Sequence, residues 1–163
     1  MSQLSFSSPV GWLSLEAEAN ALVRVTWRRS EDKETTPLLR EARRQIEAYL
    51  AGRLTRFDLP LDARGGAFER DVWRLMQAIP YGRTRNYGDI ALELGQIARA
   101  VGQACGSNPI PIVIPCHRVV AADGLGGFSG GAGRATKRWL LSLEERGSGG
   151  PRQGDLFAAV TSP

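Results

Sequence analysis

The stretch NYGDIALELGQIARAVGQACG, residues 86–106, decides the fold of this 163-residue chain. Asn86 is a preferred helix N-cap, Asp89 favours the first turn, and Gly95 is a typical helix stop, so we predict a helix over 87–94. A second helix begins near Gln96 and runs through Ile97, Val101 and Cys105 to Gly106. Two short helices joined by a tight turn form the helix-turn-helix pattern. Many such pairs bind nothing, so the pattern alone leaves DNA binding open.

A supporting helix precedes this pair. Between Phe68 and Ile79 apolar residues recur at helical spacing, and Pro80-Tyr81-Gly82 ends the pattern. The composition changes at 62–66, Asp-Ala-Arg-Gly-Gly, which indicates a domain boundary. We therefore predict a mostly helical domain over 63–146.

The N-terminal part has a different pattern. Residues 4–27 alternate polar and apolar side chains with a turn at Asn20, which predicts antiparallel strands. Thr36-Pro37 is an N-cap and first helical position, and the helical spacing that follows ends at Gly52. We predict an α+β domain over 1–62 whose Trp and Leu residues form its core. After Gly147 the composition becomes rich in Gly, Ser, Pro and Arg, which predicts a flexible tail over 147–163.

Composition limits the function classes. A hydrophobic fraction of 42% and a charged fraction of 23% indicate a soluble globular protein, and we see no signal peptide or membrane span. We therefore expect no membrane partner and a reducing, cytoplasmic location, without a Cys105–Cys116 disulfide. One His and two Cys are too few for a tetrahedral zinc site without carboxylates. The net charge of +4 permits a polyanionic partner.

One of the two cysteines, Cys116, stands beside the only histidine, His117, in an otherwise apolar run over 110–120. A thiol is a strong nucleophile as a thiolate, and a neighbouring imidazole can accept its proton directly or through water. A buried cysteine is more often an inert small hydrophobe, so Cys116 alone would not indicate catalysis.

Six ordered segments favour a catalytic Cys116 over an inert one. They are Ile79–Gly82, Tyr87–Ala91, Ala98–Gly102, Gly106–Pro109, Ile114–Val120 and Lys137–Leu141. In order and approximate spacing the chain resembles the O6-alkylguanine-DNA alkyltransferases, also called methylated-DNA–protein-cysteine methyltransferases. The resemblance is close from Phe68 to about Glu145 and looser from Leu4 to Pro60. It implies a ribonuclease-H-like N-terminal α+β domain, then a winged helix-turn-helix-like, mostly helical catalytic domain.

The resemblance also implies the chemistry, a single irreversible transfer of the alkyl group from O6-alkylguanine in DNA to Cys116. O4-alkylthymine is a further substrate that the sequence leaves open. His117 matches the water-mediated base, and Glu144 matches the carboxylate that orients it, with Glu145 the alternative one residue away. Tyr87 matches the donor near N3 or O6 of the leaving base. No cofactor is implied, and the zinc ligands of some relatives' N-terminal domains have no counterpart here.

Further positions match the family's substrate pocket. The main-chain carbonyls of Cys116 and Val119 would accept from the exocyclic amine of guanine. Ser129 matches a loop position that contacts O6, and Phe128 stands where the family often has Tyr. Asn108 matches a buried hinge between the second helix and the cysteine segment. The loop over 130–136 is longer than in some relatives, which leaves the pocket rim and its alkyl tolerance open.

DNA binding is implied for the second helix. Arg99 matches the arginine that fills the space of a base rotated out of the duplex, a step required because the target atom is inaccessible in the stack. The small residues Ala98, Ala100 and Gly102 would let this helix approach the minor groove closely. The partner is then double-stranded DNA carrying O6-alkylguanine, bound by a monomer and, in a bacterium, at the nucleoid.

Alternatives remain for the activity and for the tail. A non-catalytic DNA-lesion binder of the same fold would lack the reactive cysteine. A cysteine hydrolase would need an oxyanion hole, and a plain winged-helix regulator leaves the Cys-His-Glu set unexplained. The tail segment Gln153–Phe157 resembles the short peptides by which bacterial repair proteins bind the DNA sliding clamp, but an inert tail fits the sequence equally well.

Overall fold

The structure, a computed structural model, describes residues 1–149, which belong to two compact units. The first unit is a small sheet with a helix, and the second is mostly helical, so the predicted α+β fold class is confirmed. The first unit comprises Met1–Arg64 and Pro109–Val113, and the second comprises Gly65–Asn108 and the chain from Ile114 onward. The main break therefore follows Arg64 rather than Asp62.

The inclusion of Pro109–Val113 in the first unit was not predicted. Its physical reason is a backbone hydrogen bond from Val25 N to Pro109 O at 2.9 Å, which joins this segment to the strand that contains Val25. A boundary based on local composition cannot detect such pairing, because the two partners lie far apart in the sequence.

The sheet of the first unit has three antiparallel strands in the order β1 (Ser2–Ser8), β2 (Gly11–Glu18), β3 (Ala21–Thr26). The β2–β3 turn lies at Ala19 and Asn20, with φ of 51° and 63°. Such tight turns match the twist of the flanking strands, and Asn tolerates positive φ better than most residues. The predicted antiparallel strands and their turn are thus confirmed.

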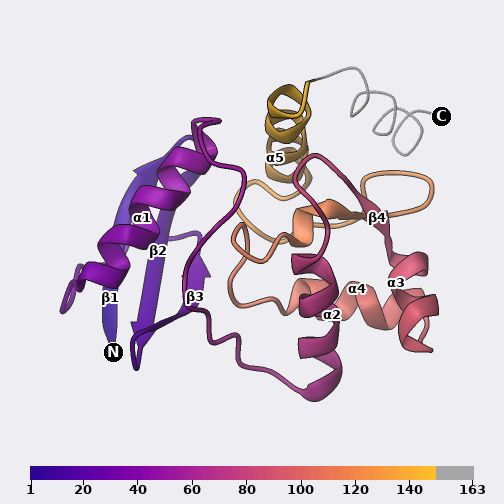
Figure 1. Cartoon of the computed structure of the whole chain (residues 1–163), viewed down its shortest axis with the longest axis horizontal. Coiled ribbons are helices and arrows are strands. Elements are labelled where there is room, and N and C mark those ends of the chain that lie inside the picture. The colour runs from indigo at the N-terminus through magenta and orange to yellow at the C-terminus, as the bar shows by residue number, and fades with distance from the viewer. Residues whose placement is uncertain (150–163) are drawn as a thin grey trace. The chain divides into compact units, whose positions relative to one another are not determined.

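Helix α1 (Pro37–Leu50) covers the sheet, as Figure 1 shows. It begins as predicted, because the Thr36 side chain accepts from Leu39 N at 3.3 Å and Pro37 occupies the first turn. The core of this unit is formed mainly by β-strand and α1 side chains that include Leu13, Leu15, Leu22, Leu39, Ile46 and Tyr49. The prediction that the Trp residues are core was wrong for Trp12, which is 38% exposed with Arg29 stacked on its ring.

In the second unit, α2 (Ala67–Gln77) supports the helix-turn-helix pair α3 (Tyr87–Leu94) and α4 (Ala98–Gly106). Trp73 on α2 is buried and its Nε1 donates to Ala104 O of α4 at 2.8 Å. The Asn86 side chain accepts from Asp89 N at 2.8 Å, and Gly95 ends α3 in the left-handed region, both as predicted.

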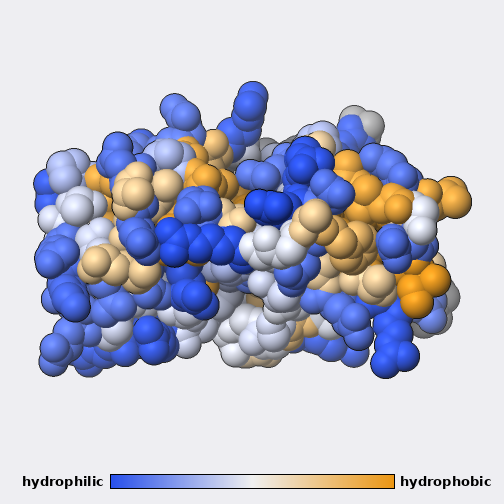
Figure 2. Space-filling model, turned by 90° about the horizontal axis from the view of Figure 1, so that it is seen from below, coloured by the Kyte–Doolittle hydropathy of each residue, from blue (hydrophilic) through white to orange (hydrophobic). Residues whose placement is uncertain are grey.

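The predicted start of α4 was early by about two residues. Ile97 is the N-cap, with extended φ and ψ, and it is 66% exposed rather than on the buried face. Leu92 near the end of α3 is 84% exposed. In Figure 2, hydrophobic side chains likewise interrupt the hydrophilic surface where Figure 1 places α3 and α4.

The remaining elements of this unit are short except for the last. Strand β4 (Arg85–Asn86) pairs in parallel with β5 (Val119–Val120), the 3-10 helix η1 spans Cys116–Arg118, and α5 spans Arg134–Gly147. The predicted tail boundary was early, because Gly147 still belongs to α5. The segment Gln153–Phe157, which resembles peptides that bind the sliding clamp, lies outside the described residues. Within residues 1–149, no helix is long and apolar enough to cross a membrane.

Candidate active site

The candidate nucleophile lies in η1, a tight turn that buries three consecutive polar or reactive side chains. Cys116 N donates to Ile114 O at 2.8 Å and Arg118 N to Pro115 O at 3.0 Å. Cys116 is 8% exposed, His117 is fully buried and Arg118 is 7% exposed. The apolar run before η1 and β5 after it keep the turn in the interior, so these side chains must find partners there.

Glu144 of α5 is the common partner. His117 Nε2 lies 2.8 Å from Glu144 Oε2, while Arg118 donates from Nε to Oε1 at 2.9 Å and from Nη2 to Oε2 at 3.0 Å. Gly82 N donates to Oε1 at 3.0 Å, and Arg118 Nη1 donates to Ile79 O at 2.7 Å. The structure thus places Glu144, and not Glu145, against His117.

These contacts determine the charge states. Burial opposes ionisation of Glu144, but the hydrogen bonds from His117 and Arg118 and the charge of Arg118 outweigh it and hold the pKa of the carboxyl well below its usual range. Burial lowers the pKa of His117 despite the attraction of Glu144, so the imidazole is neutral at pH 7. An ionised carboxylate only accepts hydrogen bonds, so Nε2 carries the imidazole proton and Nδ1 is the basic nitrogen.

The Cys116 thiol is protonated at rest. Burial raises its pKa, while a hydrogen bond from Asn108 and the positive charge of Lys137 act in the opposite direction. Asn108 also donates from Nδ2 to Ile114 O at 2.9 Å, which ties the end of α4 to the residue before Pro115. The prediction of a buried Asn108 was wrong in degree, because this residue is half-buried.

Tyr87 stands beside this thiol at the start of α3. Burial raises the pKa of its phenol to about 12, so the hydroxyl keeps its proton. Its ring lies against Gly102 of α4 and against Gly126, where an added Cβ would come within 2.8 Å of the phenol oxygen. Gly126 also has φ of +78°, so a residue with a side chain would be strained there as well.

The other predicted site residues lie nearer the surface. Ala98 and Arg99 are exposed on α4, whereas Ala100 and Gly102 are half-buried. In the loop before α5, Ser129 is exposed and Phe128 half-buried. Val119 is fully buried, and its carbonyl accepts from Lys137 Nζ at 2.7 Å. Cys105 donates to the sulfur of buried Met76 at 3.7 Å.

Two residues of the buried set were not predicted. Arg118 supplies hydrogen bonds to Glu144, and Lys137 of α5 is fully buried beside Tyr87 and Val119. The available signal for Arg118 was a charged residue inside the apolar run 110–120. Lys137 belongs to the matched segment Lys137–Leu141, but an isolated lysine in a sequence is most often a solvated surface residue.

Comparison with known proteins gives the same family for both parts of the chain. Residues 67–146 match the model described as "6-O-methylguanine DNA methyltransferase, DNA binding domain". Residues 4–63 match the model described as "6-O-methylguanine DNA methyltransferase, ribonuclease-like domain".

Similar proteins carry one name. A methylated-DNA–protein-cysteine methyltransferase of Mycolicibacterium paratuberculosis is 57% identical over 107 residues, which is 64% of each chain. One from Methanosarcina acetivorans is 41% identical over 150 residues, covering 85% of this chain and 95% of that protein. Among solved structures, Mycobacterium tuberculosis OGT in complex with DNA matches with a TM-score of 0.79 and 40% identity, over 95% of this chain and 98% of that one.

Proposed function

This chain belongs to the 6-O-methylguanine DNA methyltransferase family, and on that premise we propose that it repairs alkylated DNA by direct reversal. The methyl group of O6-methylguanine is transferred to Cys116 Sγ, and each protein molecule acts once. The observation that carries this proposal is the buried series Cys116, His117, Glu144, in which an ionised carboxylate fixes the tautomer of the histidine next to the thiol.

The reaction is a single displacement. Cys116 Sγ forms a bond to the methyl carbon as the bond between that carbon and guanine O6 breaks. The electron pair of the broken bond stays on the purine, which takes up one proton to become guanine. The proton lost by the thiol passes through a water molecule to His117 Nδ1 and from there to solvent, so the products are S-methylcysteine and guanine. A thioether does not return to a thiol, which explains single use.

Activation by His117 is needed because burial holds the thiol in its protonated, weakly nucleophilic form. The imidazolium that forms during the reaction lies 2.8 Å from the ionised Glu144 carboxylate, which stabilises its charge. Arg118 in turn keeps Glu144 ionised. We therefore assign Cys116 as acceptor, His117 as base, and Glu144 and Arg118 as positioning residues.

The lesion reaches this buried thiol only if the base is rotated out of the duplex. We propose that α4 enters the minor groove, where the small side chains of Ala98, Ala100 and Gly102 permit close approach. Arg99 is exposed on this helix and would occupy the vacated space. Tyr87 and Ser129 would then face the purine, and the carbonyls of Cys116 and Val119 would accept from its exocyclic amine.

One experiment tests the activity. The protein is incubated with duplex DNA that contains O6-methylguanine, and peptide masses are mapped. We expect Cys116 to gain one methyl group, and repaired lesions to level off at one per protein molecule. Cys116→Ser should abolish transfer while it leaves DNA binding intact. Tight binding of the lesion without any methyl gain on Cys116 would instead support the non-catalytic lesion binder.

The tail remains a separate prediction from the sequence, because Gln153–Phe157 lies outside the described residues. We propose that a peptide of this segment binds the apolar groove of a bacterial DNA sliding clamp. Its affinity should be lost when Leu156 and Phe157 are both replaced by Ala, and equal affinity of the two peptides would rule the contact out.

A further inference from the structure

Lys137 is a fully buried lysine whose hydrogen-bonding capacity is completely used within the candidate site. Its Nζ donates to Val119 O at 2.7 Å, to Gly127 O at 3.1 Å and to the Tyr87 hydroxyl oxygen at 3.4 Å. An ammonium group has three N–H donors, and here they reach three separate segments, β5, the loop before α5 and the start of α3.

The presence of a charge at this position requires an explanation. Removing an ammonium group from water costs several kcal/mol, and the three acceptors around Lys137 are neutral oxygens rather than carboxylates. An apolar side chain of similar length would fill the same volume without that cost. The charge is therefore better explained by what it does to the groups it contacts than by stability.

The contact with Tyr87 has a direction. An ammonium group cannot accept a hydrogen bond, so the phenol oxygen of Tyr87 must be the acceptor. The same oxygen also takes a backbone hydrogen bond from Gly127. With its lone pairs engaged by two donors, the Tyr87 hydroxyl can interact with a third group only by donating its own proton.

We infer that Lys137 is a positioning residue that makes the Tyr87 hydroxyl an obligatory hydrogen-bond donor to N3 of the leaving purine. The inference rests on the proposed function, since it concerns the base that would occupy the space beside Cys116. As the bond to O6 breaks, negative charge spreads over the purine ring, and a preoriented donor stabilises it. Without Lys137, the hydroxyl could rotate and accept instead of donate.

The test compares two lesions in each protein. One duplex carries O6-methylguanine, and the other carries its 3-deaza analogue, in which a C–H group replaces N3 and cannot accept a hydrogen bond. Single-turnover transfer rates give a ratio for each variant. For the wild-type protein we expect the normal lesion to react about 10- to 100-fold faster, the range of a hydrogen bond to a charged group.

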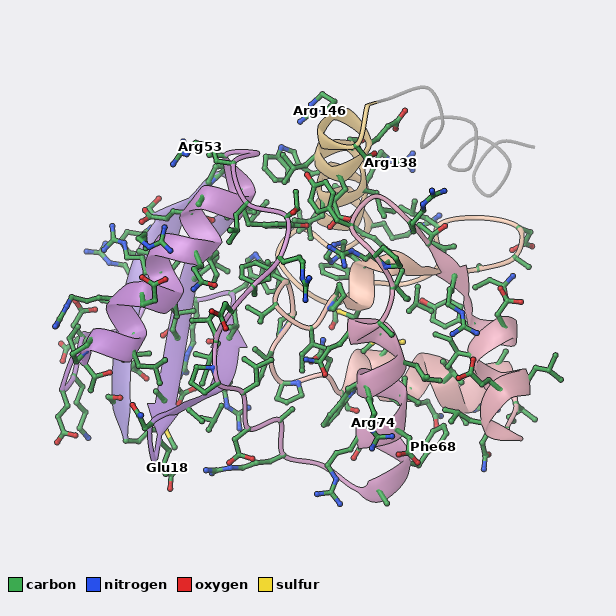
Figure 3. The ribbon with its side chains drawn as sticks, viewed as in Figure 1. Glu18, Arg53, Phe68, Arg74, Arg138 and Arg146 are labelled. Atoms are coloured by element: carbon green, nitrogen blue, oxygen red, sulfur yellow. The ribbon has the colours of Figure 1, made fainter. Side chains whose placement is uncertain are left out.

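Substitutions then show which residues cause the faster transfer from the normal lesion. We expect the ratio to fall near one in Tyr87→Phe, in Lys137→Met and in the double variant. The matched control is Arg138→Met, which removes a positive charge from an exposed residue of the same helix (Figure 3) and should keep the wild-type ratio. If Lys137→Met does not fold, Lys137→Gln replaces it in the test. An amide can accept as well as donate a hydrogen bond, so it cannot force the Tyr87 hydroxyl to act as a donor.

The outcomes separate the inference from the proposed function. A general loss of packing in a Lys137 variant slows both lesions alike and leaves the ratio unchanged. A wild-type-like ratio in a folded Lys137 variant therefore overturns the inference, as does a ratio near one in an active wild-type protein. A wild-type protein that transfers no methyl group to Cys116 from either lesion overturns the proposed function itself.

Discussion

Glu144 determines how the reactive residues of this chain are charged. Its carboxylate accepts from His117, Arg118 and the Gly82 backbone while it is fully buried. Removing one partner of such a set leaves an uncompensated buried charge, which costs about 3–5 kcal/mol. Arg118 is thus as much a part of the site as the histidine, because it keeps Glu144 ionised and the histidine in one tautomer.

The burial of His117 predicts a loss of stability in acid. Its pKa is lowered in the folded state, so below about pH 6.5 the unfolded chain binds a proton that the folded chain does not. The free energy of unfolding should then fall by up to about 1.4 kcal/mol per pH unit as pH decreases below 6.5. Urea denaturation at a series of pH values measures this slope.

The matched variant is His117→Gln, which can still donate to Glu144 but cannot be protonated. It should lose the part of this slope that begins below pH 6.5. The pKa of Glu144 is also lowered in the folded state, so its contribution to stability is likewise lost as pH falls, but only below about pH 4.5. An unchanged slope in His117→Gln would show that the histidine is not the group responsible.

Lys137 predicts a second pH effect, on selectivity rather than stability. Burial lowers its pKa to about 8, and the titratable and charged groups that influence it are Cys116, Cys105 and Arg134, with Tyr87 in contact. Above this pH the neutral amine gains a lone pair that can accept the Tyr87 proton. The ratio of transfer rates from O6-methylguanine and its 3-deaza analogue should fall as pH rises through about 8. Because thiol ionisation affects both substrates equally, a constant ratio from pH 7 to 9 would contradict this.

At the scale of the elements, the sequence predicted best what is determined locally. The N-caps at Thr36 and Asn86 and the stop at Gly95 depend on residues within one turn, and the structure has all of them. Strands β4 and β5 were missed because each has only two residues and the pair Arg85–Val119 spans a long sequence interval. No periodicity can be recognised in two residues.

The cap of α3 gives a prediction at this scale, because the helix begins at Tyr87. Asn86→Ala removes the acceptor for Asp89 N and should lower the free energy of unfolding by about 1 kcal/mol. Asn86→Asp retains a good cap and should behave like the wild type in the same urea denaturation. The transfer rate of the Ala variant should also fall, since fraying of the first turn displaces Tyr87. Equal destabilisation by Ala and Asp would exclude capping as the cause.

The candidate site was likewise predictable only where it depends on residues close together in the sequence or on the spacing of matched segments. Adjacent Cys116 and His117 are visible in any reading of the sequence, and Glu144 was found through the spacing of matched segments. The roles of Arg118 and Lys137 depend on which buried oxygens surround them in the folded chain. Propensity and periodicity carry no information on such neighbours, so the charged groups that tune the site were those that sequence reasoning missed.

At the scale of the whole molecule, the chain runs from the second unit into the first at Pro109 and returns at Ile114, two residues before Cys116. The acceptor therefore lies in the second unit, immediately after a segment that belongs to the first. Each unit also has buried side chains of its own, such as Leu13 and Ile46 in the first and Trp73 and Ile90 in the second.

The burial of Cys116 in the second unit predicts that the methylated protein is less stable than the unreacted protein. A methyl group on Cys116 adds volume to a side chain that is 8% exposed and weakens the hydrogen bond from Asn108 to its sulfur. Overpacking of this kind costs about 1–3 kcal/mol, which corresponds to a fall in Tm of about 2–12 °C for a chain of this length. Thermal unfolding after reaction with O6-methylguanine DNA and removal of the DNA measures it, with Cys116→Ala treated identically as the control.

Hydrogen exchange should show which part of the molecule loses stability after methylation. The amides of α2 and α5, the helices that contact η1 within the second unit, should exchange faster after methylation, because local opening of that unit becomes easier. The amides of β1, β2 and β3 should keep their protection, since their core does not include Cys116. An unchanged Tm would show that the pocket has room for the methyl group. Uniformly faster exchange in both units would show instead that they unfold as one, so that strain at the acceptor is shared by the entire chain.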